Sequence, residues 1–319
     1  MDDGFLIKRK TVFKTGYMRE FVPQEFFSRE DAMRIINLIE NTEGRSGCAY
    51  AHGLSFYVET KKHRMLLDLG PSGQTLQNAQ ALGIDLAKID TVILSHGHYD
   101  HSGGILPFTG INDQALIYMQ ESAKGEYYSD RGKSAPARYE YIGIDKKIAE
   151  LAQVRFLQGD YRIDDELELF TIKNRSHKLP SSNKRILVRK GDHFQCDDFV
   201  HEQFLVVSQG SQDPVRVLMS GCAHSGILSI MDAFCEKYGK EPDLVISGFH
   251  LMKKTEYTGD EIREIEEIAG ELKKYSTRFI TCHCTGIPAF DRMKAIMGDQ
   301  LAYVHSGEEI DLTSITQDL

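Results

Sequence analysis

The chain has 319 residues, of which 41% are apolar, enough for one large domain or two small ones with an ordinary packed core. Its formal net charge of -9 argues against nonspecific binding to nucleic acid or to an anionic membrane, although it leaves room for a local basic pocket. No apolar run approaches the length of a membrane span, and the six cysteines lack the regular spacing of a disulfide scaffold. We therefore expect a reduced, cytoplasmic protein with neither nucleic-acid nor membrane partners.

The first third of the sequence favours strands. Residues 1–33 mix charges with aromatic rings without a clear period, and we expect them to form an extension packed on the domain that follows. A turn is predicted at Lys61-Lys62, and a helix from about Gln74, capped by Ser72, is predicted to end at Gly83. The apolar runs predict strands at 33–39, 54–58, 64–68 and 91–94.

A cluster of histidines follows the last of these strands. In extended backbone, residues two apart point to the same side, so His96 and His98 can present both imidazoles to one point. Asp100 and His101 follow within one turn, and this group of donors suits zinc, with room for a second ion beside it. The alternative is that each histidine is an ordinary hydrogen-bonded residue at a strand end. The full spacing is rare by chance, so we favour a metal site.

The stretch 126–146 combines tyrosines with basic side chains, inside a loosely patterned region (110–191) that we interpret as a lid-like insertion. This composition can stack on a flat ring and pair with an anion, whereas the alternative is a solvated loop. His177 and His193 lie in polar surroundings and are interpreted as surface residues. The substrate contacts expected from the stretch are Tyr127, Arg131, Arg138 and Tyr139.

The second half alternates strands with helices, which predicts the α/β class. One amphipathic helix is expected over 226–238 and is closed by Gly239. Another is expected over 261–275, with acidic residues early and lysines late, as the helix dipole favours. A further helix begins near Pro288. Strands are predicted at 204–207, 215–219, 243–246 and 278–281.

Six short motifs begin at His52 (HGLS), His96 (HGHYDH), Asp198 (DFVHE), Gly221 (GCAHSG), Gly248 (GFHL) and Cys282 (CHCTG). Through them the chain resembles the metallo-β-lactamase superfamily, and within it the branch typified by the dihydropterin-methyl-ribofuranosyl-aminobenzene 5'-phosphate synthases. The resemblance runs from about Arg34 to near Leu312 and implies a four-layer αβ/βα sandwich over residues 34–319. The histidine motif is specific for the fold, and the later motifs are specific for the branch.

The resemblance also implies a larger set of metal ligands: His96, His98, Asp100, His101, His224 and His283. Cys222 stands where the superfamily usually has a bridging aspartate. Its thiolate could ligate, or Cys222 could be a small buried residue while His224 coordinates. His201 stands where another ligand histidine could fall, and Glu202 beside it could instead make the contact or orient a ligand. The alternative for His201 is a hydrogen-bonded residue at a strand start.

Other residues near these motifs are expected to support the site. Asp68 would fix a ligand imidazole through its second ring nitrogen. His250 is expected to shuttle protons or contact substrate, with coordination as the second choice, and Asp100 is expected to be catalytic. Cys282 and Cys284 flank His283 and, in extended backbone, would point away from it, so we expect both to be packing residues.

The resemblance implies a zinc enzyme with one or two ions, although manganese or iron would fit similar ligands. We expect a hydrolase in which metal-bound hydroxide attacks a small-molecule ester or phosphoester, with a phosphorylated, pterin-like heterocycle as one such substrate. One alternative is a pterin-linked synthase that makes a C–N or C–C bond at the same site. Another is a binding protein that has kept the fold and lost the chemistry.

Overall fold

The computed structural model describes residues 33–133, 135, 137–210 and 213–312. Apart from Met33, the extension predicted for residues 1–33 lies outside these ranges. The described residues belong to one compact unit that begins at Met33.

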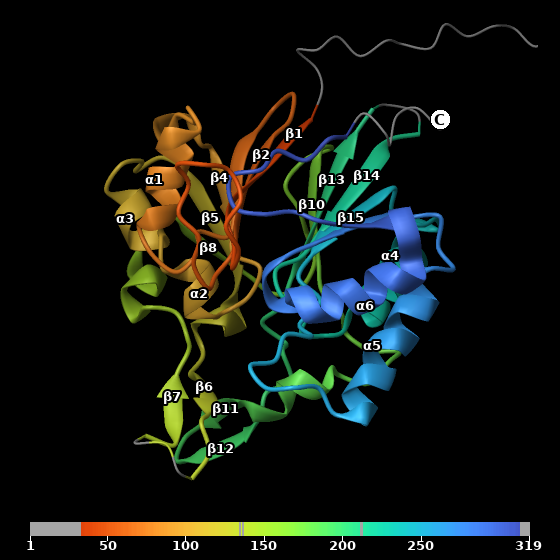
Figure 1. Cartoon of the computed structure of the whole chain (residues 1–319). Helices are drawn as coiled ribbons and strands as arrows, with labels where there is room; N and C mark the ends of the chain where they lie inside the picture. The colour runs from red at the N-terminus through yellow and green to blue at the C-terminus, as the bar shows by residue number, and fades with distance from the viewer. Residues whose placement is uncertain (1–32, 134, 136, 211–212, 313–319) are drawn as a thin grey trace, which may run out of the picture. The chain divides into compact units, whose positions relative to one another are not determined.

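Two large sheets form the centre of this unit (Figure 1). In the first, antiparallel pairing joins β1 to β2 and β2 to β3, and the remaining pairs are parallel. Its order is β1 (Arg34–Ile39), β2 (Ser55–Glu59), β3 (Arg64–Leu67), β4 (Thr91–Ile93), β5 (Leu116–Gln120) and β8 (Val154–Leu157).

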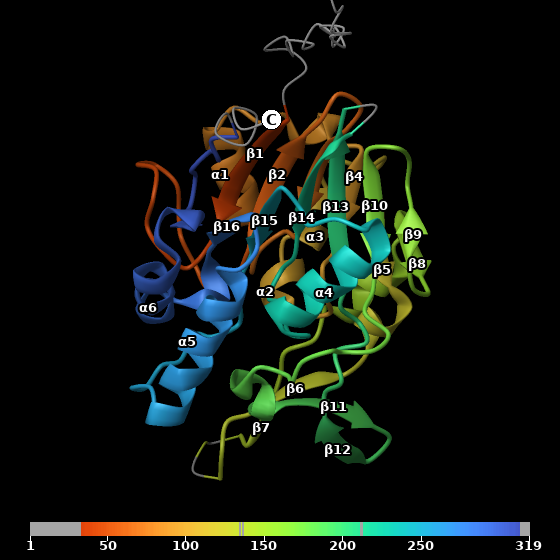
Figure 2. The same ribbon diagram turned by 90° about the vertical axis from the view of Figure 1, so that its right-hand side faces the viewer.

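The second sheet is parallel from β14 to β17 and antiparallel beyond β14. Figure 2 shows β13 to β16 side by side. The order is β17 (Leu301–Tyr303), β16 (Arg278–Thr281), β15 (Leu244–Ser247), β14 (Val215–Met219), β13 (Phe204–Gln209), β10 (Leu167–Phe170) and β9 (Tyr161–Arg162).

Helices cover the outer faces of both sheets. In Figure 1, α1 and α3 lie outside the first sheet, whereas α4, α5 and α6 lie outside the second. Another short helix, α2, contains the second half of the histidine motif, including Asp100 and His101. The bounds are α1 (Gln74–Ala81), α2 (Tyr99–Ser102), α3 (Ile105–Thr109), α4 (Ile227–Tyr238), α5 (Gly259–Leu272) and α6 (Ile287–Met297).

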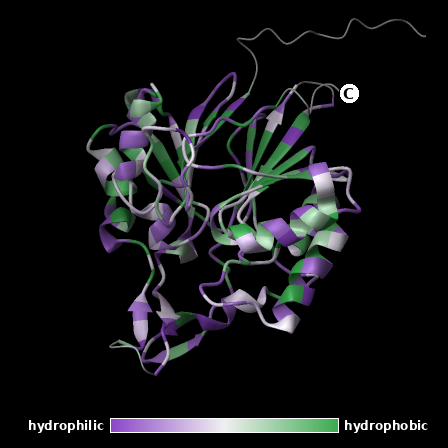
Figure 3. Ribbon diagram, in the orientation of Figure 1, coloured by the Kyte–Doolittle hydropathy of each residue, from purple (hydrophilic) through white to green (hydrophobic). Residues whose placement is uncertain are grey.

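Side-chain alternation along the strands explains the layers. In β2, Phe56 and Val58 enter the apolar core between the sheets, whereas Tyr57 enters the core under α1 and α3. In β13, Leu205 and Val207 face the first of these cores, and Phe204 packs toward the helices of the second sheet. Three apolar cores therefore separate four layers, and Figure 3 shows apolar strands inside more polar helices. The predicted α/β four-layer sandwich is confirmed.

A third, small sheet lies apart from the two large ones in Figures 1 and 2. Its strands account for only part of the insertion predicted over 110–191, because β5, β8 and β10 of that region belong to the large sheets. Its aromatic side chains pack on one another, with the rings of Tyr139 and Phe194 stacked 4.1 Å apart. The order is β12 (His193–Cys196), β11 (Ile186–Lys190), β6 (Tyr127–Asp130) and β7 (Tyr139–Tyr141).

Most predicted element ends agree with the structure to within a few residues. Helix α4 ends at Gly239, whose φ of 69° is the left-handed conformation predicted for its cap. Helix α5 begins with a capping box between Thr258 and Glu261. The cap predicted at Ser72 is present as a hydrogen bond, because its hydroxyl oxygen accepts from the Gln74 backbone N–H at 3.3 Å, although the N-cap position itself falls on Gly73. Within the described ranges, no helix is both long and apolar enough to cross a bilayer.

His63 ties the first sheet to the loop before β10. Its Nδ1 lies 2.8 Å from Asp90 Oδ1, and its Nε2 lies 3.0 Å from Asp164 Oδ2. The hydrogen bond to Asp90 raises the pKa of His63; burial opposes that rise and the Asp164 carboxylate adds to it, to a final value of about 9. Because folding raises this pKa, the protonated ring stabilises the folded state fully below its unfolded value of about 6.5. The contribution is lost as pH rises through about 9.

We therefore expect His63→Gln to lower the free energy of unfolding by about 1 kcal/mol at pH 6 and by much less at pH 9.5. Urea unfolding of wild type and variant at the two pH values measures this difference. An equal loss at both values would show that the charge on His63 adds nothing to stability.

Candidate metal centre

The candidate site residues follow the carboxyl ends of strands in both large sheets. The motif that starts at His96 follows β4, Cys222 and His224 follow β14, His250 follows β15, and His283 follows β16. In open sheets of this kind the carboxyl ends of parallel strands are where ligands bind. The sandwich brings the ends of the two sheets together, so residues more than 100 positions apart in the sequence meet at one place.

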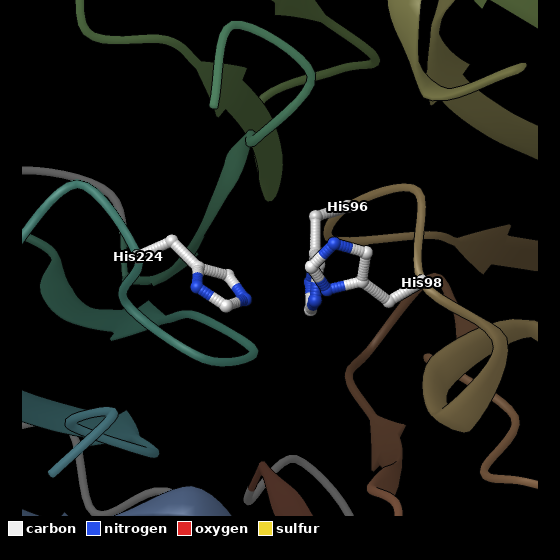
Figure 4. A group of neighbouring side chains, drawn as sticks. All are labelled: His96, His98 and His224. Carbon is white, nitrogen blue, oxygen red and sulfur yellow. The ribbon is translucent and has the colours of Figure 1, made fainter. Parts of the chain in front are cut away.

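Three histidines converge on one point. Figure 4 shows the imidazoles of His96 and His98 facing that of His224, which comes from the opposite sheet. One nitrogen from each ring lies within 4.8 Å of the others. All three Nε2 atoms are buried without a hydrogen-bond partner. Three buried, unpaired acceptors around one point fit the coordination of a divalent ion.

Hydrogen bonds fix which ring nitrogen is free in two of these histidines. The Ser95 hydroxyl donates to Asp68 at 2.7 Å, so its oxygen accepts from His96 Nδ1 at 2.9 Å and Nε2 keeps its lone pair. Asn183 contacts both the backbone and the ring of His224. Its amide nitrogen donates to the His224 carbonyl oxygen at 2.7 Å, and its amide oxygen faces the ring Nδ1 at 2.9 Å. Both histidines are thus held in the tautomer that can bind a metal through Nε2.

A second group lies beside the first. His283 Nε2 is 3.5 Å from Asp100 Oδ2, and His101 Nε2 is 3.8 Å from the same oxygen. Asn41 holds His283 as Asn183 holds His224, donating to its carbonyl oxygen at 3.1 Å and facing Nδ1 at 2.8 Å. His52, with half of its side chain exposed, places Nε2 3.5 Å from Asp100 and lies at the solvent side of the group. The donors of His52, Asp100 and His283 could together hold an ion.

Asp68 supports the first-sheet half of the site, in the role expected for it. It accepts hydrogen bonds from the Ser95 backbone N–H at 2.7 Å and faces His101 Nδ1 at 2.6 Å. Gly221 passes so close that a Cβ there would lie 2.2 Å from the Ser95 hydroxyl oxygen. Only glycine permits this approach of β14 to the Asp68–Ser95 pair.

The backbone at the site is strained. Among the described residues, each non-glycine residue with a positive φ lies at the site or next to one of its residues. Such conformations cost free energy and persist where surrounding contacts enforce them, which happens most often at functional sites. These residues are Asp68, Phe199, Ala223, His250 and His283.

Burial keeps the histidines of the first group neutral. It lowers the pKa of His98 to about 3, and the neighbouring His201 contributes to that shift. Burial and the adjacent imidazoles also hold the pKa values of His96 and His224 well below the ordinary range. Burial raises the pKa of the Asp100 carboxyl, but the neighbouring His101 and His283 lower that pKa by more. The net result is a pKa below the usual range. Neutral imidazoles and an ionised carboxylate are the forms that ligate metals.

Cys222 lies between the two groups. Its sulfur is buried 3.2 Å from His101 Nε2. It lies within 4.8 Å of donors on His96 and His101, and also of donors on His224 and His250. The position that the resemblance assigns to a bridging aspartate therefore holds a thiol within reach of both groups.

His201 has no free nitrogen for a metal. Its Nδ1 accepts from the Gly97 backbone N–H at 2.9 Å, so Nε2 carries the proton and donates to Asp197 at 3.0 Å. This arrangement matches the hydrogen-bonded alternative and braces the loop between His96 and His98. Glu202 accepts from the backbone N–H groups of His224 and Ser225 at 2.7 and 2.8 Å, so it orients the His224 loop.

Three motif residues remain, His250, Cys282 and Cys284, and they agree with expectation to different degrees. His250 Nδ1 is buried without a partner, and its ring centroid lies 4.1 Å from that of His224. Cys282 belongs to the core between the sheets, as expected. Cys284 is buried, but the expectation that it points away from His283 is wrong, because His283–Thr285 forms a 3₁₀ turn rather than extended backbone. The turn places the Cys284 sulfur near a ring nitrogen of His283 and the sulfur of Cys222.

Of the predicted substrate contacts, Tyr127 lies nearest to the metal centre. Its ring centroid is 5.8 Å from that of His98. Arg131 pairs with Glu140, and Arg138 pairs with Asp130 at 3.0 Å, so both arginines are paired within their own hairpin. Tyr139 stacks on Phe194 in the small sheet. The surface position predicted for His193 agrees with its exposure, as does that of His177, which pairs with Asp232.

Sequence reasoning assigned no role to four residues that support the site: Glu40, Asn41, Asn183 and His52. Glu40 accepts from the His283 backbone N–H at 2.9 Å and from the Tyr303 hydroxyl at 3.0 Å. Only His52 lay in a recognised motif, which could have drawn attention to it. Glu40, Asn41 and Asn183 lie outside the recognised motifs, and no local sequence pattern marks them.

Comparison with known proteins gives one family match. Residues 51–173 match the metallo-beta-lactamase superfamily. An uncharacterised protein of Methanocaldococcus jannaschii, MJ0448, is 27% identical over 86% of this chain and 98% of its own length. The 7,8-dihydropterin-6-methyl-4-(beta-D-ribofuranosyl)-aminobenzene-5'-phosphate synthase of the same organism is 25% identical over 88% of this chain and 97% of its own length.

Two solved structures resemble the whole unit. Tm1679, described as a metal-dependent hydrolase of the beta-lactamase superfamily, is 28% identical, covers 88% of this chain and 99% of its own, and has a TM-score of 0.71. The metallo-beta-lactamase fold protein YhfI from Bacillus subtilis is 14% identical, covers 88% of this chain and 100% of its own, and has a TM-score of 0.53. The second likeness concerns the fold alone.

The two asparagine clamps yield a test of metal binding. Because Asn183→Ala and Asn41→Ala remove the partners that orient His224 and His283, each should weaken zinc affinity by roughly tenfold to a hundredfold. Competition with a chromogenic chelator measures that affinity. Asn112→Ala is the matched control, since this buried amide donates to Leu86 and Ile89 carbonyls away from the site. Unchanged affinity in both clamp variants would remove the asparagines from the metal centre.

Proposed function

Because residues 51–173 carry a domain of the metallo-beta-lactamase superfamily, we propose that the chain is a metal-dependent hydrolase that cleaves a small-molecule ester or phosphoester. The observation that carries the proposal is the set of buried, unpaired Nε2 atoms on His96, His98, His224 and His283. An unpaired buried acceptor costs about 1–3 kcal/mol, so four at one place need a compensating ligand.

The donor set supports zinc in one or two positions, with manganese or iron as other ions that similar ligands accept. When bound, such ions polarise the bond under attack and lower the pKa of water to about 7. Asp100, ionised and shared between His101 and His283, holds the negative charge of the second group. His250 has a free ring nitrogen beside His224, so it can donate a proton to a leaving group or contact the substrate.

Two comparisons bear on the reaction. Tm1679 is described as a hydrolase, which supports hydrolysis here. The 25% identical relative is named as a synthase of a dihydropterin-linked aminobenzene ribofuranosyl phosphate, which supports a phosphorylated, pterin-like substrate and makes synthesis the second candidate reaction. The substrate is proposed to be a small molecule in both cases, and the buried, fully assembled centre argues against a binding protein that has lost its chemistry.

The two reactions are separable by experiment. Zinc-loaded protein is incubated either with bis(4-nitrophenyl) phosphate and 4-nitrophenyl acetate, or with an activated dihydropterin-methyl compound and (beta-D-ribofuranosyl)-aminobenzene 5'-phosphate. Metal-dependent release of nitrophenol supports the hydrolase. A condensed product found by mass spectrometry, without nitrophenol release, would replace it with the synthase.

Asp100→Asn tests the centre within either reaction. The variant keeps the shape of the side chain and loses the charge beside His101 and His283, so we expect turnover to fall by roughly a hundredfold. The metal-free variant should stay folded but melt at a somewhat lower temperature, because the ionised carboxylate of wild type faces His52, His101 and His283. Wild-type turnover in the variant would take Asp100 out of the mechanism.

The anion clamp proposed for Arg131 and Arg138 makes a separate prediction about substrate binding. If the two arginines bind a phosphate, the double alanine variant should raise KM for a phosphorylated substrate by roughly tenfold, with unchanged metal content. Glu140→Gln is the matched variant, because it releases Arg131 from its partner and should lower KM. Unaltered KM in both variants would support the solvated-loop alternative instead.

A further inference from the structure

Cys222 and Cys284 meet although their strands are not neighbours. Cys222 follows β14 and Cys284 follows β16, with β15 between them. Strands lie about 4.8 Å apart, so the ends of β14 and β16 are separated by roughly 10 Å. Even so, the Cys284 thiol donates to the Cys222 carbonyl oxygen at 3.6 Å, and the two sulfurs lie within 4.8 Å of each other.

Gly248, at the end of β15, makes this contact possible. A Cβ on Gly248 would lie 2.6 Å from the Cys284 sulfur and 3.0 Å from the Gly221 carbonyl oxygen. Any side chain would therefore push Cys284 away from Cys222. The glycine leaves an opening in the middle strand through which the two sulfurs approach the same point.

The donors around that point fit a metal. The sulfurs of Cys222 and Cys284 lie with a ring nitrogen of His283, all three within 4.8 Å of one another. Ligands of a tetrahedral ion with bonds of about 2.3 Å lie roughly 3.8 Å apart, so small side-chain rotations suffice. Both cysteines are buried, at 3% and 4% exposure, and His283 Nε2 is buried without a hydrogen-bond partner.

We propose that Cys222 and Cys284 are both thiolate ligands of the ion on the His283 side of the centre. Each thiol releases its proton to solvent when the ion binds. Sulfur ligation makes this position selective for zinc, cobalt or cadmium over manganese and magnesium, which prefer oxygen. The inference rests on the metal binding in the proposed function and is independent of the reaction that the centre performs.

Cobalt provides a direct readout, because thiolate ligands of Co²⁺ give sulfur-to-metal charge-transfer absorption in the near ultraviolet. Metal-free full-length protein is titrated with CoCl₂, and wild type should show this band saturating with the stoichiometry of the site. Cys222→Ser and Cys284→Ser should each remove about half of the intensity, as expected for two equivalent sulfur ligands. Cys282→Ser is the matched control: this neighbouring cysteine is fully buried in the core between the sheets, and its loss should leave the band unchanged.

Gly248→Ala gives a second test that alters no donor. It should weaken the band as Cys284→Ser does, because the added methyl displaces the Cys284 sulfur, while circular dichroism verifies that the variant is folded. Absence of the band in wild type that binds Co²⁺, or a full band in Cys284→Ser, would overturn the proposal. Either result would leave the proposed function intact, since binding without sulfur ligation still supports a metal-dependent enzyme. Failure to bind Co²⁺ at all would overturn both.

Discussion

The burial of imidazole nitrogens without hydrogen-bond partners is the constraint on which the rest of this structure depends. A buried polar atom without a partner is costly, and here four such atoms belong to metal-ligand candidates gathered at one end of the sandwich. The surrounding residues do not relieve that cost. They maintain it instead. Ser95, Asn183 and Asn41 hydrogen-bond to the Nδ1 atoms of His96, His224 and His283, which leaves each Nε2 with its lone pair.

His201 is the opposite case, because neither of its ring nitrogens lacks a hydrogen-bond partner. It lies among the other rings, 5.4 Å from His98 by ring centroids, yet both of its nitrogens are occupied. Its acceptor atom is used by the Gly97 backbone N–H, so the ring braces the loop rather than offering a lone pair. Proximity alone therefore does not identify a ligand, whereas the hydrogen-bond partner of the second nitrogen does.

The two sheets contribute unequal parts of the centre. The first supplies a compact motif whose four donors lie within six consecutive residues. The second supplies one or two donors from the end of each of β14, β15 and β16, and close approach between these ends depends on Gly221 and Gly248. The small sheet touches the centre through Tyr127, while its outer hairpin keeps its arginines paired with its own acids. The candidate ligands therefore come from the two large sheets, and Tyr127 of the small sheet lies beside them.

From the sequence alone, apolar periodicity and glycine caps predicted the α/β class and most ends of the elements that were proposed, because these are local properties. The four-layer sandwich was implied by the resemblance of the motifs to a known superfamily. The sequence also determined the motif from His96 to His101, where all donors are neighbours in the chain. Only the tertiary structure decided the tautomers, the bracing role of His201, and the parts played by Glu40, Asn41 and Asn183, since each depends on a hydrogen bond between distant segments. The position of Cys284 was likewise decided there, because a 3₁₀ turn replaced the extended backbone on which the sequence argument relied.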